Sequence, residues 1–158
     1  MLQLTRKADY GLRLMLEVGG SPNGTTTTTE VVQRQPIPYE FLRKVAQTLV
    51  SHGLLVSERG VRGGLTLARP AEAISVLDVV RAFGSPALNL CCTDPPHCDR
   101  RDICAVHHVW VEAQSEMERV LGGSLLSSLI DRQAMLDRRG AGRRGPRGAV
   151  VAGAVENA

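Results

Sequence analysis

The sequence has few aromatic residues and no long apolar segment. Two Tyr, two Phe and one Trp occur among 158 residues, so aliphatic residues must fill the core that a 43% apolar share allows. No run approaches the about 18 apolar residues of a membrane span, and the N-terminus lacks a secretory h-region. We therefore expect a cytoplasmic protein without a membrane partner, and the length allows one compact domain with at most a small added module.

Signatures of catalysis are also missing. The sequence contains no nucleotide-binding glycine loop and no nucleophile paired with a base, so we do not expect an enzyme.

The net charge is only +3, but it is unevenly distributed. Residues 1–90 carry ten Lys/Arg against seven Asp/Glu, residues 91–136 carry four against seven, and residues 137–158 carry five against two. An anionic partner at the N-terminal block is compatible with this pattern, although so small an excess is common in folded proteins.

The first fifty residues predict three helices. The first spans about residues 6–18 behind Thr5 as N-cap, and a threonine run at residues 25–29 supplies the N-cap of a short second helix. A third helix begins at Pro38 and ends at Gly53, and its apolar stripe consists of Leu42, Val45, Ala46 and Leu49. Two short helices joined by a few residues indicate a helix-turn-helix.

The start of the third helix carries the candidate DNA-binding side chains. They share its open face, opposite the apolar stripe: Pro38, Tyr39, Glu40, Arg43 and Lys44. In a major groove, Glu40 would accept a hydrogen bond from cytosine N4, and Arg43 would pair with guanine.

Two β-prone runs, at residues 54–56 and 65–67, flank a glycine-rich turn and predict a hairpin. Directly after a helix-turn-helix, such a hairpin is the wing of a winged helix. Arg59 and Arg62 in the turn would clamp phosphates or enter a minor groove, whereas on an isolated hairpin they would be only solvated.

The C-terminal half predicts a further helix around residues 76–83, an irregular loop, a long helix from Ala105 to about Gly122, and a short last helix. The long helix carries an apolar stripe that includes Trp110 and Met117. A winged-helix core is too small to cover it, so we expect a homodimer, the alternative being a fold-back onto the same chain. The expected fold class is mainly α with a small β-hairpin wing. The expected divisions are a winged helix-turn-helix (1–84), a loop that carries all four cysteines (85–104), dimerisation and short helices (105–136) and a disordered basic tail (137–158).

All four cysteines lie within 14 positions: Cys91, Cys92, Cys98 and Cys104. In a reducing compartment such a group is a metal or redox site rather than a set of structural disulfides. Three of them follow the spacing Cys92-x5-Cys98-x5-Cys104-x2-His107, and His107 shares a helical face with Cys104. Thiolates on a loop with one weaker partner suit an iron-sulfur cluster.

Two other chemistries fit the same residues. Zinc accepts three Cys and one His, but the tight C-x2–4-C knuckle of structural zinc sites is absent. A cluster-free regulator would instead form a reversible disulfide between Cys91 or Cys92 and a later cysteine. In the cluster interpretation Cys91 is not a ligand, because neighbouring side chains diverge.

In this order, the motifs resemble those of the bacterial winged-helix iron-sulfur regulators, which include the iron-sulfur cluster assembly regulator and the nitric-oxide-sensitive repressor. The resemblance runs from Leu4 to about Ile130. It is carried by LTRKADYGLR at residues 4–13, RGVRGG at residues 59–64, Pro70-Ala71, and the segment from Cys104 to Trp110.

The resemblance implies a homodimeric DNA-binding transcription factor, of repressor type, with one cluster per protomer held by Cys92, Cys98 and Cys104. The fourth ligand differs between relatives. It would be His107 at a [2Fe-2S] cluster, as in the assembly regulator, or Asp9 of the partner subunit at a [4Fe-4S] cluster, as in the nitric-oxide repressor. Two-fold symmetry would require an inverted-repeat operator in double-stranded DNA. Changes at the cluster, caused by nitric oxide, redox or iron-sulfur status, would then alter the spacing of the two reading heads.

Overall fold

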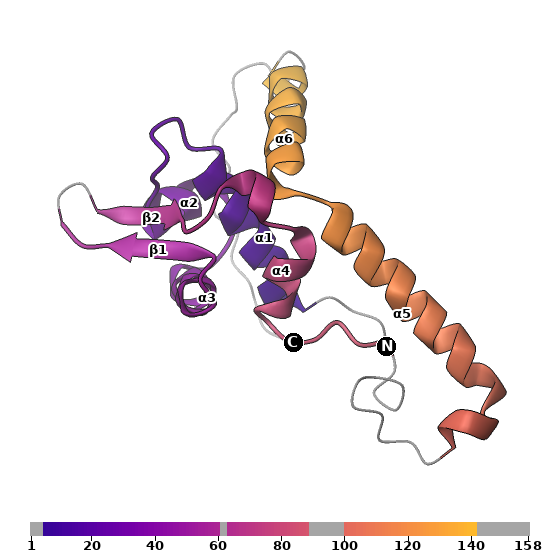
Figure 1. Ribbon diagram of the computed structural model, residues 1–158. Coiled ribbons are helices and arrows are strands. Elements are labelled where there is room, and N and C mark those ends of the chain that lie inside the picture. The colour runs from indigo at the N-terminus through magenta and orange to yellow at the C-terminus, as the bar shows by residue number, and fades with distance from the viewer. Residues whose placement is uncertain (1–4, 61–62, 89–99, 142–158) are drawn as a thin grey trace, which may run out of the picture.

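A computed structural model describes residues 5–60, 63–88 and 100–141 of the chain (Figure 1). Helices dominate these residues, together with one antiparallel hairpin. The helices are α1 (Arg6–Gly19), α2 (Thr28–Arg34), α3 (Tyr39–Ser51), α4 (Val76–Arg81), α5 (Ala105–Gly123) and α6 (Leu126–Ala141). The strands are β1 (Leu55–Glu58) and β2 (Gly64–Leu67), and the short 3-10 turns are η1 (Ala71–Ala73) and η3 (Arg101–Ile103).

Side-chain caps fix where several helices begin. The Thr5 hydroxyl accepts a hydrogen bond from the Ala8 N–H at the start of α1. Thr27 and Glu30 form a reciprocal capping box at α2, as predicted for the threonine run. A capping box satisfies two of the backbone N–H groups that a helix start leaves without partners, so these helices start at defined positions.

The core lies between α1, α3, the hairpin and the start of α6. The predicted stripe of α3 is confirmed, because Leu42, Val45, Ala46 and Leu49 are all buried. Additional buried residues come from the elements around α3: Leu14, Met15 and Val18 of α1, Leu55 and Leu65 of the hairpin, and Leu126 of α6. α3 therefore turns its other face away from the core.

The end of α3 also follows the prediction. Gly53 has a φ of +66°, and the Leu54 N–H donates to the Leu49 carbonyl at 2.9 Å. The Gly53 N–H donates to the Val50 carbonyl at 3.0 Å, which completes a Schellman motif. The chain reverses here and enters β1 directly.

The hairpin pairs Leu55 with Leu67 at one end and Glu58 with Gly64 at the other. Thr26 adds a bridge on the outer side of β2, since it exchanges two backbone hydrogen bonds with Leu65, of 3.1 and 2.7 Å. The loop before α2 is thereby tied to the wing.

Several boundaries differ from those predicted. β1 begins at Leu55 and runs two residues further than expected, and α4 ends at Arg81, short of Phe83. The last helix is much longer than predicted, because α6 continues to Ala141 and so includes residues assigned to the tail. Residues 142–158 lie outside the described residues.

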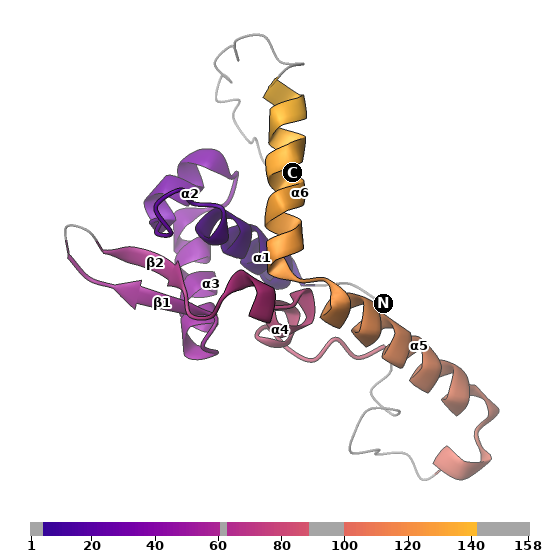
Figure 2. The ribbon, with the colours of Figure 1, turned by 45° about the horizontal axis from the view of Figure 1, so that its top comes forward.

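α5 and α6 leave the winged helix in different directions. Figures 1 and 2 show α5 projecting away from the other helices, with α6 leaving the corner in another direction. No residue of α5 is buried. The C-terminal half of the helix still contacts its own chain, since Glu118 pairs with Arg81 of α4 and Leu121 packs against Val76 and Val80. The corner between α5 and α6 is held by backbone bonds, from Val76 N–H to Ser124 O and from Leu126 N–H to Ile74 O.

Candidate nucleic-acid interface and cysteine region

The open face of α3 consists of the predicted side chains. All five predicted contact residues at its start are exposed to solvent: Pro38, Tyr39, Glu40, Arg43 and Lys44. Tyr39 is among the exposed large apolar side chains, at 44%. The structure therefore places these side chains together at one end of the helix, which is the end that a recognition helix inserts first.

Two of these residues form an ion pair. The Arg43 guanidinium donates from Nη2 and Nε to the Glu40 carboxylate, at 3.2 and 3.3 Å. Both side chains are more than half exposed, so solvent screens the pair and its strength is small. The guanidinium can therefore exchange this carboxylate for another acceptor.

A groove of about 410 Å³ separates α3 from the hairpin. Its lining comes from α2, α3 and both strands, and its polar side chains include Thr28, Arg43, Gln47 and Ser57. Gln47 was not among the residues predicted to contact DNA, although it lies one turn after Arg43 on the same exposed face. That i, i+4 spacing was a usable signal.

The wing carries Arg59, which is exposed directly after β1. Arg62 lies outside the described residues. The turn needs glycine at position 63, because a Cβ there would lie 2.3 Å from the Glu58 carbonyl oxygen.

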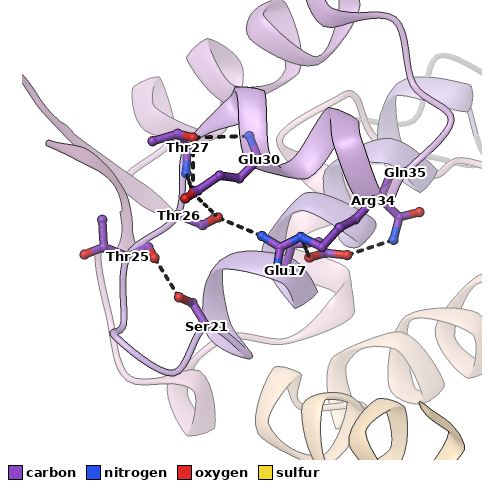
Figure 3. A network of polar contacts seen from close by, with 8 residues as sticks. All are labelled: Glu17, Ser21, Thr25, Thr26, Thr27, Glu30, Arg34 and Gln35. Atoms are coloured by element: carbon purple, nitrogen blue, oxygen red, sulfur yellow. Dashed lines mark hydrogen bonds and ion pairs between the residues drawn. The ribbon is translucent and has the colours of Figure 1, made fainter. Parts of the chain in front are cut away.

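A polar network orients α2 on the wing (Figure 3). The Glu30 carboxylate accepts hydrogen bonds from the Thr27 N–H at 2.8 Å and from the Thr26 hydroxyl at 3.0 Å. Bonds from the Thr27 backbone and from the two hydroxyls lower the pKa of Glu30 below its ordinary 4.5. Thr26 is the buried member, and it also bridges to Leu65 of β2.

The network continues to α1. Arg34 donates to the Thr26 hydroxyl at 3.1 Å and pairs with Glu17 at 3.3 Å (Figure 3). The same Glu17 accepts a bond from the Gln35 amide at 2.9 Å. Sequence analysis did not find this network, because no local pattern reveals that residue 17 meets residues 34 and 35.

Of the predicted cluster ligands, Cys104, His107 and Asp9 lie in described residues, whereas Cys92 and Cys98, like Cys91, lie outside them. Cys104 immediately precedes α5, is partly buried, and makes no side-chain capping bond. The His107 N–H donates to the Cys104 carbonyl at 3.1 Å, so the two residues share the first turn of α5. Within 5–60, 63–88 and 100–141, no three His, Cys, Asp or Glu residues converge as metal ligands would.

Asp9 lies in the first turn of α1, and its carboxylate pairs with Arg13 at 3.0 Å. Both side chains are about half exposed. The structure does not bring Asp9 and Cys104 of one chain into a common metal-binding group.

α5 presents an apolar strip to solvent. Val106, Val109 and Val120 are 51%, 60% and 55% exposed, and Trp110 and Met117 are only partly covered. Among the described helices, none has the length and apolar character that crossing a membrane requires.

Comparison with known proteins gives the family. Residues 4–132 match the model of the Rrf2 family, described as an iron-dependent transcriptional regulator. The protein rrf2 of Nitratidesulfovibrio vulgaris is 33% identical over 132 residues, which cover 82% of this chain and 87% of that protein. The regulator IscR of Klebsiella pneumoniae, of the HTH type, is 29% identical over 140 residues, covering 88% of this chain and 86% of IscR.

Solved structures show the same fold. IscR of T. potens superimposes with a TM-score of 0.65 at 22% identity, covering 92% of this chain and 94% of that one. CymR, the global cysteine regulator of B. subtilis, gives 0.68 at 24% identity, covering 84% and 98%. The expected winged-helix fold is thus confirmed. The relatives are transcriptional regulators rather than enzymes, as expected, and the chain belongs to the Rrf2 family of DNA-binding transcriptional regulators.

Proposed function

We propose that this regulator is a homodimeric repressor whose operator affinity depends on an iron-sulfur cluster held by Cys92, Cys98 and Cys104. One observation carries the proposal: Cys104 is the residue at which the cysteine segment joins α5. The same helix exposes its apolar strip to solvent. The proposed cluster ligand Cys104 is therefore attached directly to the helix that we propose forms the dimer interface.

The chemistry of the described donors fits an iron-sulfur cluster. The Cys104 sulfur has no capping bond to give up, so it is available as a ligand. His107 lies in the same helical turn and supplies an imidazole from the same chain. When bound, the cluster supplies an iron centre that reacts with oxidants and nitric oxide.

Two side chains compete for the role of fourth ligand. We favour His107, because its turn of α5 begins at Cys104. Asp9 of the partner subunit is the alternative, and its exposed pair with Arg13 is weak enough to be exchanged. His107→Ala and Asp9→Ala separate the two, since only loss of the true ligand alters the Mössbauer spectrum, which also distinguishes [2Fe-2S] from [4Fe-4S].

DNA binding uses the open face of α3 and the wing. Pro38, Tyr39, Glu40, Arg43 and Lys44 would contact bases and phosphates in a major groove, while Arg59 and Arg62 hold the backbone or the minor groove beside it. Two such heads, related by the two-fold symmetry of a homodimer, require an inverted-repeat operator. A protein that binds the bacterial chromosome acts in the cytoplasm, which is the compartment we propose.

The experiment pairs two cysteine variants of protein isolated without oxygen. Cys98→Ala should lose the visible cluster absorption, and its operator footprint should no longer respond to nitric oxide or oxygen. Cys91→Ala is the matched control and should keep both.

Other results contradict the proposal. Zinc in place of iron identifies a zinc-stabilised regulator. A colourless protein with a disulfide that reductant reverses, and with operator affinity that follows it, identifies a thiol switch.

A further inference from the structure

The side-chain amide of Gln114, on α5, holds the chain just before the cysteine segment. The Leu88 N–H donates to Gln114 Oε1 at 2.9 Å, and Gln114 Nε2 donates to the Pro86 carbonyl at 3.0 Å. The amide pairs with the N–H of one residue and the carbonyl of another, as a neighbouring strand would.

The same amide leads to α4. Gln114 Nε2 also donates to Glu118 Oε1 at 2.6 Å, and the other oxygen of Glu118 accepts from Arg81 Nη2 at 2.9 Å. Arg81 is the last residue of α4. A continuous polar path therefore joins residues 86–88 to α4 through two side chains of α5, and both ends of the Gln114 amide are used.

Both ends of the cysteine segment are thus attached to α5. The segment ends at Cys104, which directly precedes α5. It begins after Leu88, which is bonded to Gln114, ten residues after Cys104. Ten residues of α-helix span about 15 Å. Cys92 and Cys98 lie in sequence between these two points. A rearrangement of the segment that reaches its ends acts on the covalent bond at Cys104 or on the hydrogen bonds at Leu88, and the hydrogen bonds yield first.

The far end of the path reaches the domain core. Val79 of α4 belongs to the cluster of buried residues that also contains Leu42 and Val45 of α3. After α4, Phe83 packs so closely on α1 that a Cβ at Gly11 would lie 2.4 Å from its ring. A close-packed core transmits a displacement of α4 to the helices around it.

We propose that Gln114 is a positioning residue that couples the state of the cysteine segment to α4 and thereby to the DNA-reading domain. The inference rests on the proposed function, because it explains how a change at the cluster reaches α3.

The test compares Gln114→Leu with Gln133→Leu. Gln133 is a matched control because its amide also bonds a carboxylate four residues later, Asp137 at 2.9 Å, but on the exposed face of α6. Each protein is isolated without oxygen. The measurements are iron content, the ratio of operator affinities with and without the cluster, and hydrogen exchange of the Leu88 amide.

In Gln114→Leu we expect unchanged iron content and faster exchange at Leu88. Allosteric couplings are typically about 5- to 150-fold, and we expect the affinity ratio to fall within about twofold of one. Gln133→Leu should behave as the wild type does. If Leu88 exchange is accelerated in Gln114→Leu but the ratio of operator affinities with and without the cluster equals that of the wild type, the inference is overturned.

Arg81→Met provides a second test if Gln114→Leu does not fold, because Arg81 is exposed and connects the path to α4 through its pair with Glu118. It should lower the affinity ratio, and an unchanged ratio overturns the inference. The wild type alone tests the proposed function: a protein without iron, or with equal affinities in both forms, refutes that function and this inference together.

Discussion

Replacing Arg43 with Ala should weaken operator binding selectively. Arg43 lies on the open face of α3, where it is half exposed and paired with Glu40 at 3.2 Å. To contact a guanine, the guanidinium must leave this carboxylate or share it. The result depends on which interaction is the stronger.

The typical free energies of the two interactions favour the proposed DNA contact. An exposed pair of this spacing on one helix contributes about 0.3–0.5 kcal/mol. A bidentate contact of Arg with guanine contributes about 1–3 kcal/mol of discrimination. Arg43→Ala should therefore lower operator affinity by roughly 5- to 150-fold. Glu40→Gln frees the guanidinium and should raise affinity for unrelated DNA about twofold, with weaker discrimination at the paired cytosine.

The assay is a fluorescence anisotropy titration on an operator selected from a random-sequence library, with a scrambled duplex as reference. Arg119→Ala is the control, since Arg119 and Glu116 form a pair of the same i, i+3 spacing on α5. If Arg43→Ala and Arg119→Ala have equal effects, or if Arg43→Ala weakens both duplexes equally, Arg43 does not read a base.

Three further predictions concern the wing, the dimer and the polar network. Arg59→Ala should weaken operator binding by about 1–3 kcal/mol, and an unchanged footprint titration would remove Arg59 from the interface. Val109→Asp puts a charge on a side chain that is 60% exposed on α5, so sedimentation should show a monomer; a persistent dimer would move the interface elsewhere. Glu30→Gln should lower the melting temperature at neutral pH and reduce its acid dependence. Because the pKa of Glu30 is lowered in the folded protein, its charged carboxylate stabilises the fold above pH 4.5, and this stability is lost as the pH falls through the folded pKa. A melting temperature that falls with acid equally in Glu30→Gln and in the wild type would contradict that role.

Local patterns predicted much of the winged helix. The stripe Leu42, Val45, Ala46 and Leu49 has the helical period, and all four side chains are buried. Gly53 marked the end of α3 because a left-handed conformation suits glycine, and its φ is +66°. Periodicity and capping act within a few residues, so the sequence alone reveals them.

The end of α6 illustrates where a periodic pattern stops being informative. After Ile130 the sequence has no apolar stripe at helical spacing, and the side chains of residues 131–139 are exposed. The helix continues because Gln133, Ala134 and Met135 are strong helix formers, and propensity was the signal to use.

Contacts between distant residues were beyond sequence reasoning. The network from Glu17 to Glu30 joins α1, α2 and the wing, and Gln114 meets a backbone 26 residues earlier. No spacing rule predicts such pairs, because they depend on how completed helices pack. The ligand roles of Cys92, Cys98 and Cys104 remain predictions from sequence.

The most direct test of the account is one operator titration carried out twice on the same anaerobic sample, before and after a chelator removes the iron. The account predicts iron in the isolated protein and an affinity that changes about 5- to 150-fold when the iron is lost. Iron-free protein, or identical binding curves before and after chelation, would contradict it.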